Sequence, residues 1–168
     1  NPTPGIQPIP TPELRDDLQL FYELLCALAL GDAAAIRQVT RRMERVNLTA
    51  GVTSPIALRP IAQAAVALSR GDPALALALL DSLPPTGVQA PSLLQHSHAY
   101  QRFLRGEALA SLGRHEEALG WFRSFQVIFG FDLPYRGPAL YREAESLEAL
   151  GRREEARGVY QRFLGLYA

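Results

Sequence analysis

An internal repeat is the feature that most constrains this chain. Residues 111–125 read SLGRHEEALGWFRSF, and residues 149–163, which lie 38 positions later, read ALGRREEARGVYQRF, so eight of the fifteen positions are identical. A unit of this size cannot bury its apolar face alone and must stack on its neighbours. The repeat therefore predicts an array of stacked supersecondary units.

The repeat frame extends upstream through four glycines. They stand at positions 31, 71, 113 and 151, with spacings of 40, 42 and 38 residues. Glycine adopts the left-handed conformation that ends a helix, and Asp32 and Asp72, which follow two of these glycines, are good N-caps for a next helix. We expect one domain over residues 13–168, with repeats at about 13–47, 55–84, 92–129 and 138–168.

Apolar periodicity predicts that each repeat is a pair of helices. In the first segment Leu14, Leu18, Phe21, Leu25 and Leu28 recur at steps of three and four, which is typical of a helix that buries one face. No segment shows the alternation of a strand. The expected helices are 13–30, 33–46, 55–70, 74–83, 92–112, 114–129, 139–150 and 153–167, with loops at 47–54, 86–91 and 131–138.

The first twelve residues differ in composition from the rest. They contain five prolines, at positions 2, 4, 8, 10 and 12, which remove backbone donors and favour extended segments. We interpret residues 1–12 as a Pro-rich linker. A ligand for an SH3-type domain is the alternative, because proline spacing of the Pro-x-x-Pro kind is present.

Composition excludes several classes of function. Seventeen acidic residues balance seventeen basic ones, so no net charge favours nucleic acid or an anionic membrane. All the basic residues are Arg, which excludes chemistry that needs a Lys amine. The longest apolar run, residues 24–30, is too short to cross a bilayer. The single cysteine, Cys26, allows no internal disulfide, and its apolar neighbours indicate a buried structural thiol.

Candidate catalytic groups are scattered. His96 and His98 are two positions apart and would point in different directions on a helix, unlike a helical metal pair. Glu116 and Glu117 fall at a predicted helix start, where acidic residues are favoured, so a structural role is expected for them. Gly-rich phosphate loops and nucleophile elbows are absent from the sequence. We expect no metal site, no cofactor and no enzyme activity.

Two sets of five positions resemble the tetratricopeptide repeat. They are Gly106, Leu109, Gly113, Ala118 and Phe122, and then Ala144, Leu147, Gly151, Ala156 and Tyr160. Glycine permits the turn, the alanines let two helices approach closely, and the aromatic residues fill the adjacent groove. The second repeat matches at Ala64, Gly71, Ala76 and Leu80, whereas in the first repeat Leu24, Ile36 and Thr40 replace the expected residues.

The resemblance implies an all-α fold, an α-solenoid of about four antiparallel helix pairs in a right-handed superhelix. The spacings exceed the 34 residues of the family repeat, and the extra residues fall in the loops between repeats. A HEAT-like array has a similar period and remains the alternative.

The resemblance also implies that the first helix of each pair lines a concave binding surface. The inward positions would be Phe21, Ile61, Phe103 and Tyr141, followed one turn later by Leu25, Ala65, Glu107 and Glu145. We expect Phe21 and Ile61 to pack between repeats, and both packing and binding are open for the other two aromatic residues. Aromatic residues and Arg often dominate interface energies. The predicted partner-binding residues are Phe103, Tyr141, Arg102, Arg142, Glu107 and Glu145.

The predicted function is a non-catalytic protein–protein interaction module within a longer, bacterial-type protein. Its partner would be a protein or peptide of basic or apolar character, with no nucleic acid and no membrane span. A ligand-sensing or peptide-sensing domain is the alternative. We expect truncation of Phe103 and Tyr141 together to weaken binding while the fold stays intact. The apolar last helix, which contains Tyr160 and Phe163, predicts either a missing cap or packing on another domain or a second copy.

Overall fold

The computed structural model describes residues 12–45, 58–83, 95–126 and 130–166. The chain divides into two compact units, residues 1–54 and 55–168. The first unit contains α1 (Pro12–Ala29) and α2 (Ala33–Arg45). The second contains α3 (Leu58–Ser69), α4 (Pro73–Asp81), α5 (Gln95–Ser111), α6 (His115–Arg123), α7 (Leu133–Ala149) and α8 (Arg153–Leu164), with 3-10 turns η2 (Ser124–Gln126) and η3 (Gly130–Asp132) between α6 and α7.

The four repeat glycines join the helices of each pair. All have positive φ, from 64° to 75°. At Gly113 the amide donates to the Ala110 carbonyl at 3.0 Å, and the next amide, that of Arg114, donates to the Leu109 carbonyl at 2.9 Å. The same two bonds recur at the other three glycines. This is the Schellman arrangement, in which only glycine takes the left-handed position without strain. The predicted turns are confirmed.

Two kinds of residue follow these glycines. The Asp72 carboxylate accepts a hydrogen bond from the Leu75 amide at 3.0 Å, which caps α4, and Asp32 caps α2 in the same way. Arg114 makes no side-chain cap and instead binds Glu117 three residues later. Arg152 repeats this pairing with Glu155.

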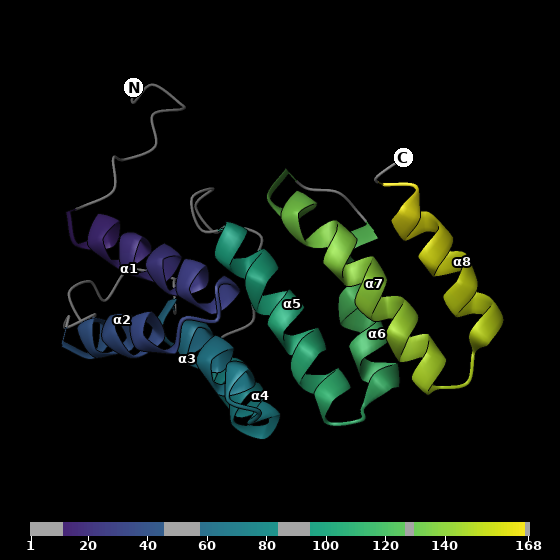
Figure 1. The fold of residues 1–168 in the computed structure, drawn as a ribbon, viewed down its shortest axis with the longest axis horizontal. Coiled ribbons are helices and arrows are strands. Elements are labelled where there is room, and N and C mark those ends of the chain that lie inside the picture. Colours follow the sequence, from purple (N-terminus) through teal and green to yellow (C-terminus); the bar gives the residue numbers. More distant parts are fainter. Residues whose placement is uncertain (1–11, 46–57, 84–94, 127–129, 167–168) are drawn as a thin grey trace, which may run out of the picture. The chain divides into compact units, whose positions relative to one another are not determined.

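The helices pack as sequential pairs. In the first unit α1 packs on α2, and in the second unit the pairs are α3 with α4, α5 with α6 and α7 with α8. Within the second unit each second helix also contacts the following first helix, and α5 contacts both α3 and α7. Figure 1 shows α5 and α7 side by side, with α6 behind α7. The first helices of this unit therefore form one side of the stack.

Small residues set the close helix contacts. Eight of the described alanines are at most 1% exposed, namely Ala64, Ala76, Ala99, Ala108, Ala118, Ala139, Ala144 and Ala156. Ala118 belongs to a cluster with Leu109 and Phe122, and Ala156 belongs to one with Leu147 and Val159. These clusters combine side chains from both helices of a pair with side chains of the neighbouring pair, and Ala118 and Ala156 are buried within them, as expected for positions where helices approach closely.

The prediction of a loop over residues 131–138 is wrong, because α7 begins at Leu133 and includes Pro134 and Pro138. Pro134 lies in the first turn, where a missing amide donor costs little. Pro138 removes one hydrogen bond, but the buried Gly137 and Ala139 on either side of it are fixed by packing. Tertiary packing therefore overrides the local helix-breaking preference.

The prediction of a buried Cys26 is also wrong, because its side chain is exposed. Among the described side chains of α1, the buried ones are Leu20, Phe21, Leu24 and Ala27, and Cys26 lies off that face. The apolar neighbours in sequence did not determine the direction of this side chain, since adjacent helical residues point about 100° apart.

Some predictions fall outside the described residues, namely the loops at 47–54 and 86–91 and the linker over residues 1–12, of which only Pro12 is described, as the first residue of α1. The single domain over residues 13–168 stays a prediction. Within the described ranges no helix is long and apolar enough to cross a membrane. In the same ranges no group of three or more His, Cys, Asp or Glu side chains could hold a metal ion.

Candidate functional site

A charged bridge links the first helices of two neighbouring pairs. Arg142 of α7 donates from Nη2 to Oε2 of Glu107 on α5 at 3.0 Å, and its Nε lies 2.8 Å from Glu107 Oε1. Its Nη1 donates to Oε2 of Glu145, one turn further along α7, at 2.6 Å. The three side chains are 42%, 21% and 37% exposed, respectively. Three of the predicted residues therefore meet at a site that solvent reaches.

The bridge carries an excess of negative charge, because two carboxylates share one guanidinium. Burial raises the pKa of Glu107. The charge of Arg142 and its hydrogen bond lower this pKa, whereas the charge of Glu145 adds to the rise. The pKa of Arg142 is raised by both carboxylates, which outweigh the opposing effect of its burial. Burial and the charge of Glu107 also raise the pKa of Tyr100, on the same helix, to about 12. A further positive group here would relieve the repulsion between the two carboxylates.

Arg102 is engaged elsewhere. Its Nη2 forms an ion pair with the buried Asp132, and its Nη1 donates to the hydroxyl of Ser124 at 3.1 Å. Its guanidinium carbon also lies 4.5 Å from the centre of the Phe125 ring. These contacts fasten α5 to the segment between α6 and α7, so Arg102 has a structural role.

Phe103 lies in an aromatic cluster between α5, η2 and α7. Its ring centre is 6.1 Å from that of Phe122, 6.4 Å from that of Phe125 and 5.6 Å from that of Tyr135. Phe103 is half-buried there. Truncation of Phe103 would remove packing as well as any binding contact, so the double truncation with Tyr141 tests stability together with binding.

Tyr141 points toward α8. Its ring centre lies 5.9 Å from that of Tyr160 and 5.7 Å from that of Phe163, and the residue is 41% exposed. The six predicted residues thus fall in three places: the bridge, the interior aromatic cluster and the surface beside α8. Phe21 and Ile61, which we expected to pack, are 1% and 2% exposed.

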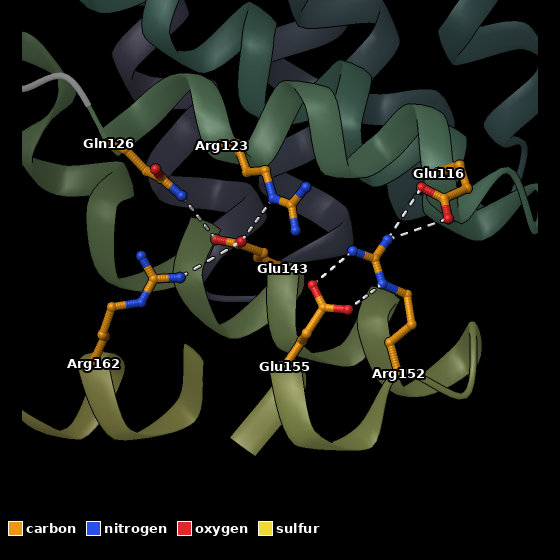
Figure 2. A network of polar contacts seen from close by, with 7 residues as sticks. All are labelled: Glu116, Arg123, Gln126, Glu143, Arg152, Glu155 and Arg162. Atoms are coloured by element: carbon orange, nitrogen blue, oxygen red, sulfur yellow. Dashed lines mark hydrogen bonds and ion pairs between the residues drawn. The ribbon is translucent and has the colours of Figure 1, made fainter. Parts of the chain in front are cut away.

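A buried carboxylate that the sequence analysis missed lies on α7 and faces the second helices of two neighbouring pairs, α6 and α8. Glu143 of α7 is 2% exposed, and Arg123 of α6 donates to it from Nε at 2.9 Å. Arg162 of α8 lies 3.6 Å away, and Gln126 donates at 3.5 Å. Figure 2 shows the two arginines approaching Glu143 from different helices. The sequence does hold a signal for this buried carboxylate, because a glutamate stands among the apolar core positions of α7.

A shallow cavity of about 300 Å³ adjoins this carboxylate. Four of its lining residues are charged, and the full lining is Arg123, Glu143, Leu147, Glu155, Gly158, Val159 and Arg162. Glu155 is held by Arg152, which also lies 3.3 Å from Glu116 on α6 (Figure 2). Each charge is matched by an opposite charge nearby, and the network links α6, α7 and α8.

Comparison with known proteins gives one family. Residues 138–168, which comprise most of α7 and all of α8, match the family model described as tetratricopeptide repeat. Neither the curated proteins nor the solved structures gave a match. Tetratricopeptide repeats are generally non-catalytic and are typical of protein–protein interaction modules. The expected bacterial origin has no support from this match. Residues 138–168 therefore match a tetratricopeptide repeat, and the described part of the chain is helical throughout, with helices packed in sequential pairs as in a helical repeat of this type.

Proposed function

We propose that this chain is a non-catalytic interaction module that binds a protein segment across the first helices α5 and α7. The observation that carries the proposal is the bridge of Glu107, Arg142 and Glu145, because it is the place where predicted residues from two neighbouring repeats meet. Stacked repeats present their first helices as a shared surface, and a segment lying across that surface would contact both helices at once.

The charge of the bridge defines the partner. Glu107 and Glu145 outnumber Arg142, and Glu148, one turn beyond Glu145, is exposed on the same stripe of α7. An Arg or Lys of the partner would be attracted to this acidic surface, and it could share a carboxylate with Arg142 without displacing it. A basic residue flanked by apolar residues is thus the expected recognition element.

Apolar contacts are available beside the bridge. Pro138 and Tyr141 precede Glu145 on the exposed stripe of α7, at intervals that place them on one face of the helix. The partner's apolar residues would pack on this stripe while its basic residue reaches the bridge. A sensor of small apolar molecules would instead need an enclosed apolar cavity, and the cavity beside Glu143 is lined largely by charged residues.

The test is selection of peptides from a displayed random library on the purified chain. We expect the selected peptides to combine Arg or Lys with apolar residues. Their affinity should fall about tenfold or more in Glu107→Gln/Glu145→Gln, since charge-assisted bonds of this kind contribute at least the free energy of one factor of ten. Fluorescence anisotropy of the labelled peptides measures the change.

A matched control uses another glutamate of the same unit. Glu154 is 81% exposed and pairs only with Arg157 among its described salt bridges, so Glu154→Gln removes one negative charge away from the bridge. It should leave peptide affinity unchanged. Selected peptides that are acidic, or that bind the double variant as tightly as the wild type, would contradict the proposal.

A further inference from the structure

The aromatic cluster around Phe103 has a counterpart one repeat later. A shift of 38 residues maps Phe103, Phe122 and Phe125 onto Tyr141, Tyr160 and Phe163. The geometry is the same, because the first ring of each set lies near the other two: 6.1 Å and 6.4 Å in the first set, 5.9 Å and 5.7 Å in the second. We call the second set the α8 aromatic face.

The first set is covered by α7. Tyr135 lies 5.6 Å from Phe103 and 6.0 Å from Phe125, and Ala139, one turn later, is 1% exposed in the same cluster. As a result Phe122 and Phe125 are at most 2% exposed. A helix that carries an aromatic residue and, four positions later, a small residue thus covers this type of aromatic set.

The α8 aromatic face has no such helix over it among the described residues. Tyr141 is 41% exposed, and Tyr160 and Phe163 are only half-buried. Leu164, next to Phe163, is 64% exposed. Several large apolar side chains on one patch of a soluble domain often mark an interaction site.

The rim of this face also repeats a charge. In the upstream set, Glu107 forms an ion pair with Arg142 of the covering helix. Arg142 lies three residues after Ala139. The same shift maps Glu107 onto Glu145, which stands at 37% exposure one turn after Tyr141. A covering helix with a basic residue at the position of Arg142 would therefore reach Glu145, and Glu148 beside it adds to the acidic rim.

We propose that the α8 aromatic face binds an amphipathic helix of a partner protein. That helix carries an aromatic residue, a small residue four positions later, and an Arg or Lys three positions after that. The occupant's chemistry is taken from the interface that α7 forms with α5 and α6, of which the α8 aromatic face is the next copy in the stack. This surface adjoins the exposed stripe of α7 beside the bridge and shares Tyr141 and Glu145 with it, whereas Glu107 belongs to the bridge and Tyr160 and Phe163 belong to the α8 aromatic face.

The probe for the test is a synthetic peptide of residues 132–149, stapled between positions 141 and 145 to hold it helical. It carries Tyr135, Ala139 and Arg142 and is offered to the intact protein. We expect saturable binding by fluorescence anisotropy. Tyr141→Ala in the protein and Tyr135→Ala in the peptide should each weaken binding about tenfold, as for a buried aromatic anchor.

Control variants separate this face from the rest of the molecule. Leu75 on α4 is 50% exposed, and Leu75→Ala should leave peptide binding unchanged. Glu107→Gln alters the bridge but not the α8 aromatic face and should also have no effect, so failure of one proposal does not imply failure of the other. The peptide variant needs no folding of its own, which keeps the test valid even if a protein variant is unstable.

Two results would overturn the proposal. The first is absence of peptide binding by the intact protein. If, in addition, the mass in sedimentation rises with protein concentration and Tyr141→Ala restores the monomer, the occupant is a second copy of the chain. The second is binding that survives both alanine substitutions.

Discussion

Gly106 and Phe122 are in contact at the crossing of α5 and α6, where a Cβ on Gly106 would lie 2.5 Å from Cε1 of the ring. Phe122 is 1% exposed and packs on Phe103, so its ring cannot move aside without disturbing the aromatic cluster. The glycine is therefore required by packing and not by backbone conformation.

We predict that Gly106→Ala lowers the free energy of unfolding. Overpacking costs about 1 to 3 kcal/mol, and this should exceed the gain of roughly 1 kcal/mol in helix propensity. Chemical denaturation measures the difference from the wild type.

Gly120 provides the matched control for that substitution. It is also helical, in α6, but a Cβ there would meet no atom within 4 Å. Gly120→Ala should therefore raise the free energy of unfolding by about 0.5 to 1 kcal/mol. If both variants shift the free energy of unfolding in the same direction, the contact between Gly106 and Phe122 does not determine the effect of an alanine at position 106.

A second prediction concerns the buried carboxylate of Glu143. Arg123 donates a hydrogen bond to it at 2.9 Å, whereas Arg162 lies 3.6 Å away. Arg123→Ala should cost about 1 to 3 kcal/mol of unfolding free energy, because a buried acceptor loses its closest charged donor. Arg162→Ala should cost under about 1 kcal/mol, because Arg162 is more distant from Glu143 and is half exposed. Urea denaturation of the two variants measures both.

The compensating variant is Arg123→Ala/Glu143→Met. Removing the carboxylate as well as its partner avoids a buried unpaired charge, and a flexible apolar side chain fits among the neighbouring apolar residues of α7. The double variant should be more stable than Arg123→Ala alone. Equal losses for the two single arginine variants would show that Arg162 contributes as much as Arg123.

The helix pairs could be predicted from the sequence because their determinants are local. Gly113 and Gly151 end one helix and begin the turn to the next through hydrogen bonds within six residues, and Asp72 caps α4 through a bond to Leu75. Such signals need no knowledge of the rest of the fold. The start of α7 was missed because Pro134 and Pro138 favour a loop locally, while Tyr135 near the start of the helix packs on Phe103 of α5 and Phe125 of η2.

The candidate site could be predicted only in part for the same reason. Glu107, Arg142 and Glu145 meet because neighbouring first helices align in the repeat frame, which the sequence displays. Arg102 stands just before Phe103 in sequence, yet it pairs with Asp132, thirty residues away, and is not available at the bridge. The network of Glu143 likewise depends on partners 17 to 20 residues distant, for which the repeat frame has no equivalent.

The last prediction uses the protonation of Glu107. Its folded pKa is raised, so the folded protein binds a proton more tightly than the unfolded chain, and acidification through the interval above the ordinary carboxyl pKa favours folding at this residue. Arg142 opposes that rise, so Arg142→Gln should raise the pKa further and cost about 1 to 3 kcal/mol at neutral pH. Because a protonated Glu107 no longer needs a positive partner, the difference in unfolding free energy between variant and wild type should narrow as pH falls.

Thermal unfolding at a series of pH values measures this gap in stability, with Glu107→Gln/Arg142→Gln as the control. The double variant should lack the narrowing. A gap that is constant with pH would mean that the loss in Arg142→Gln comes from contacts other than the ion pair with Glu107.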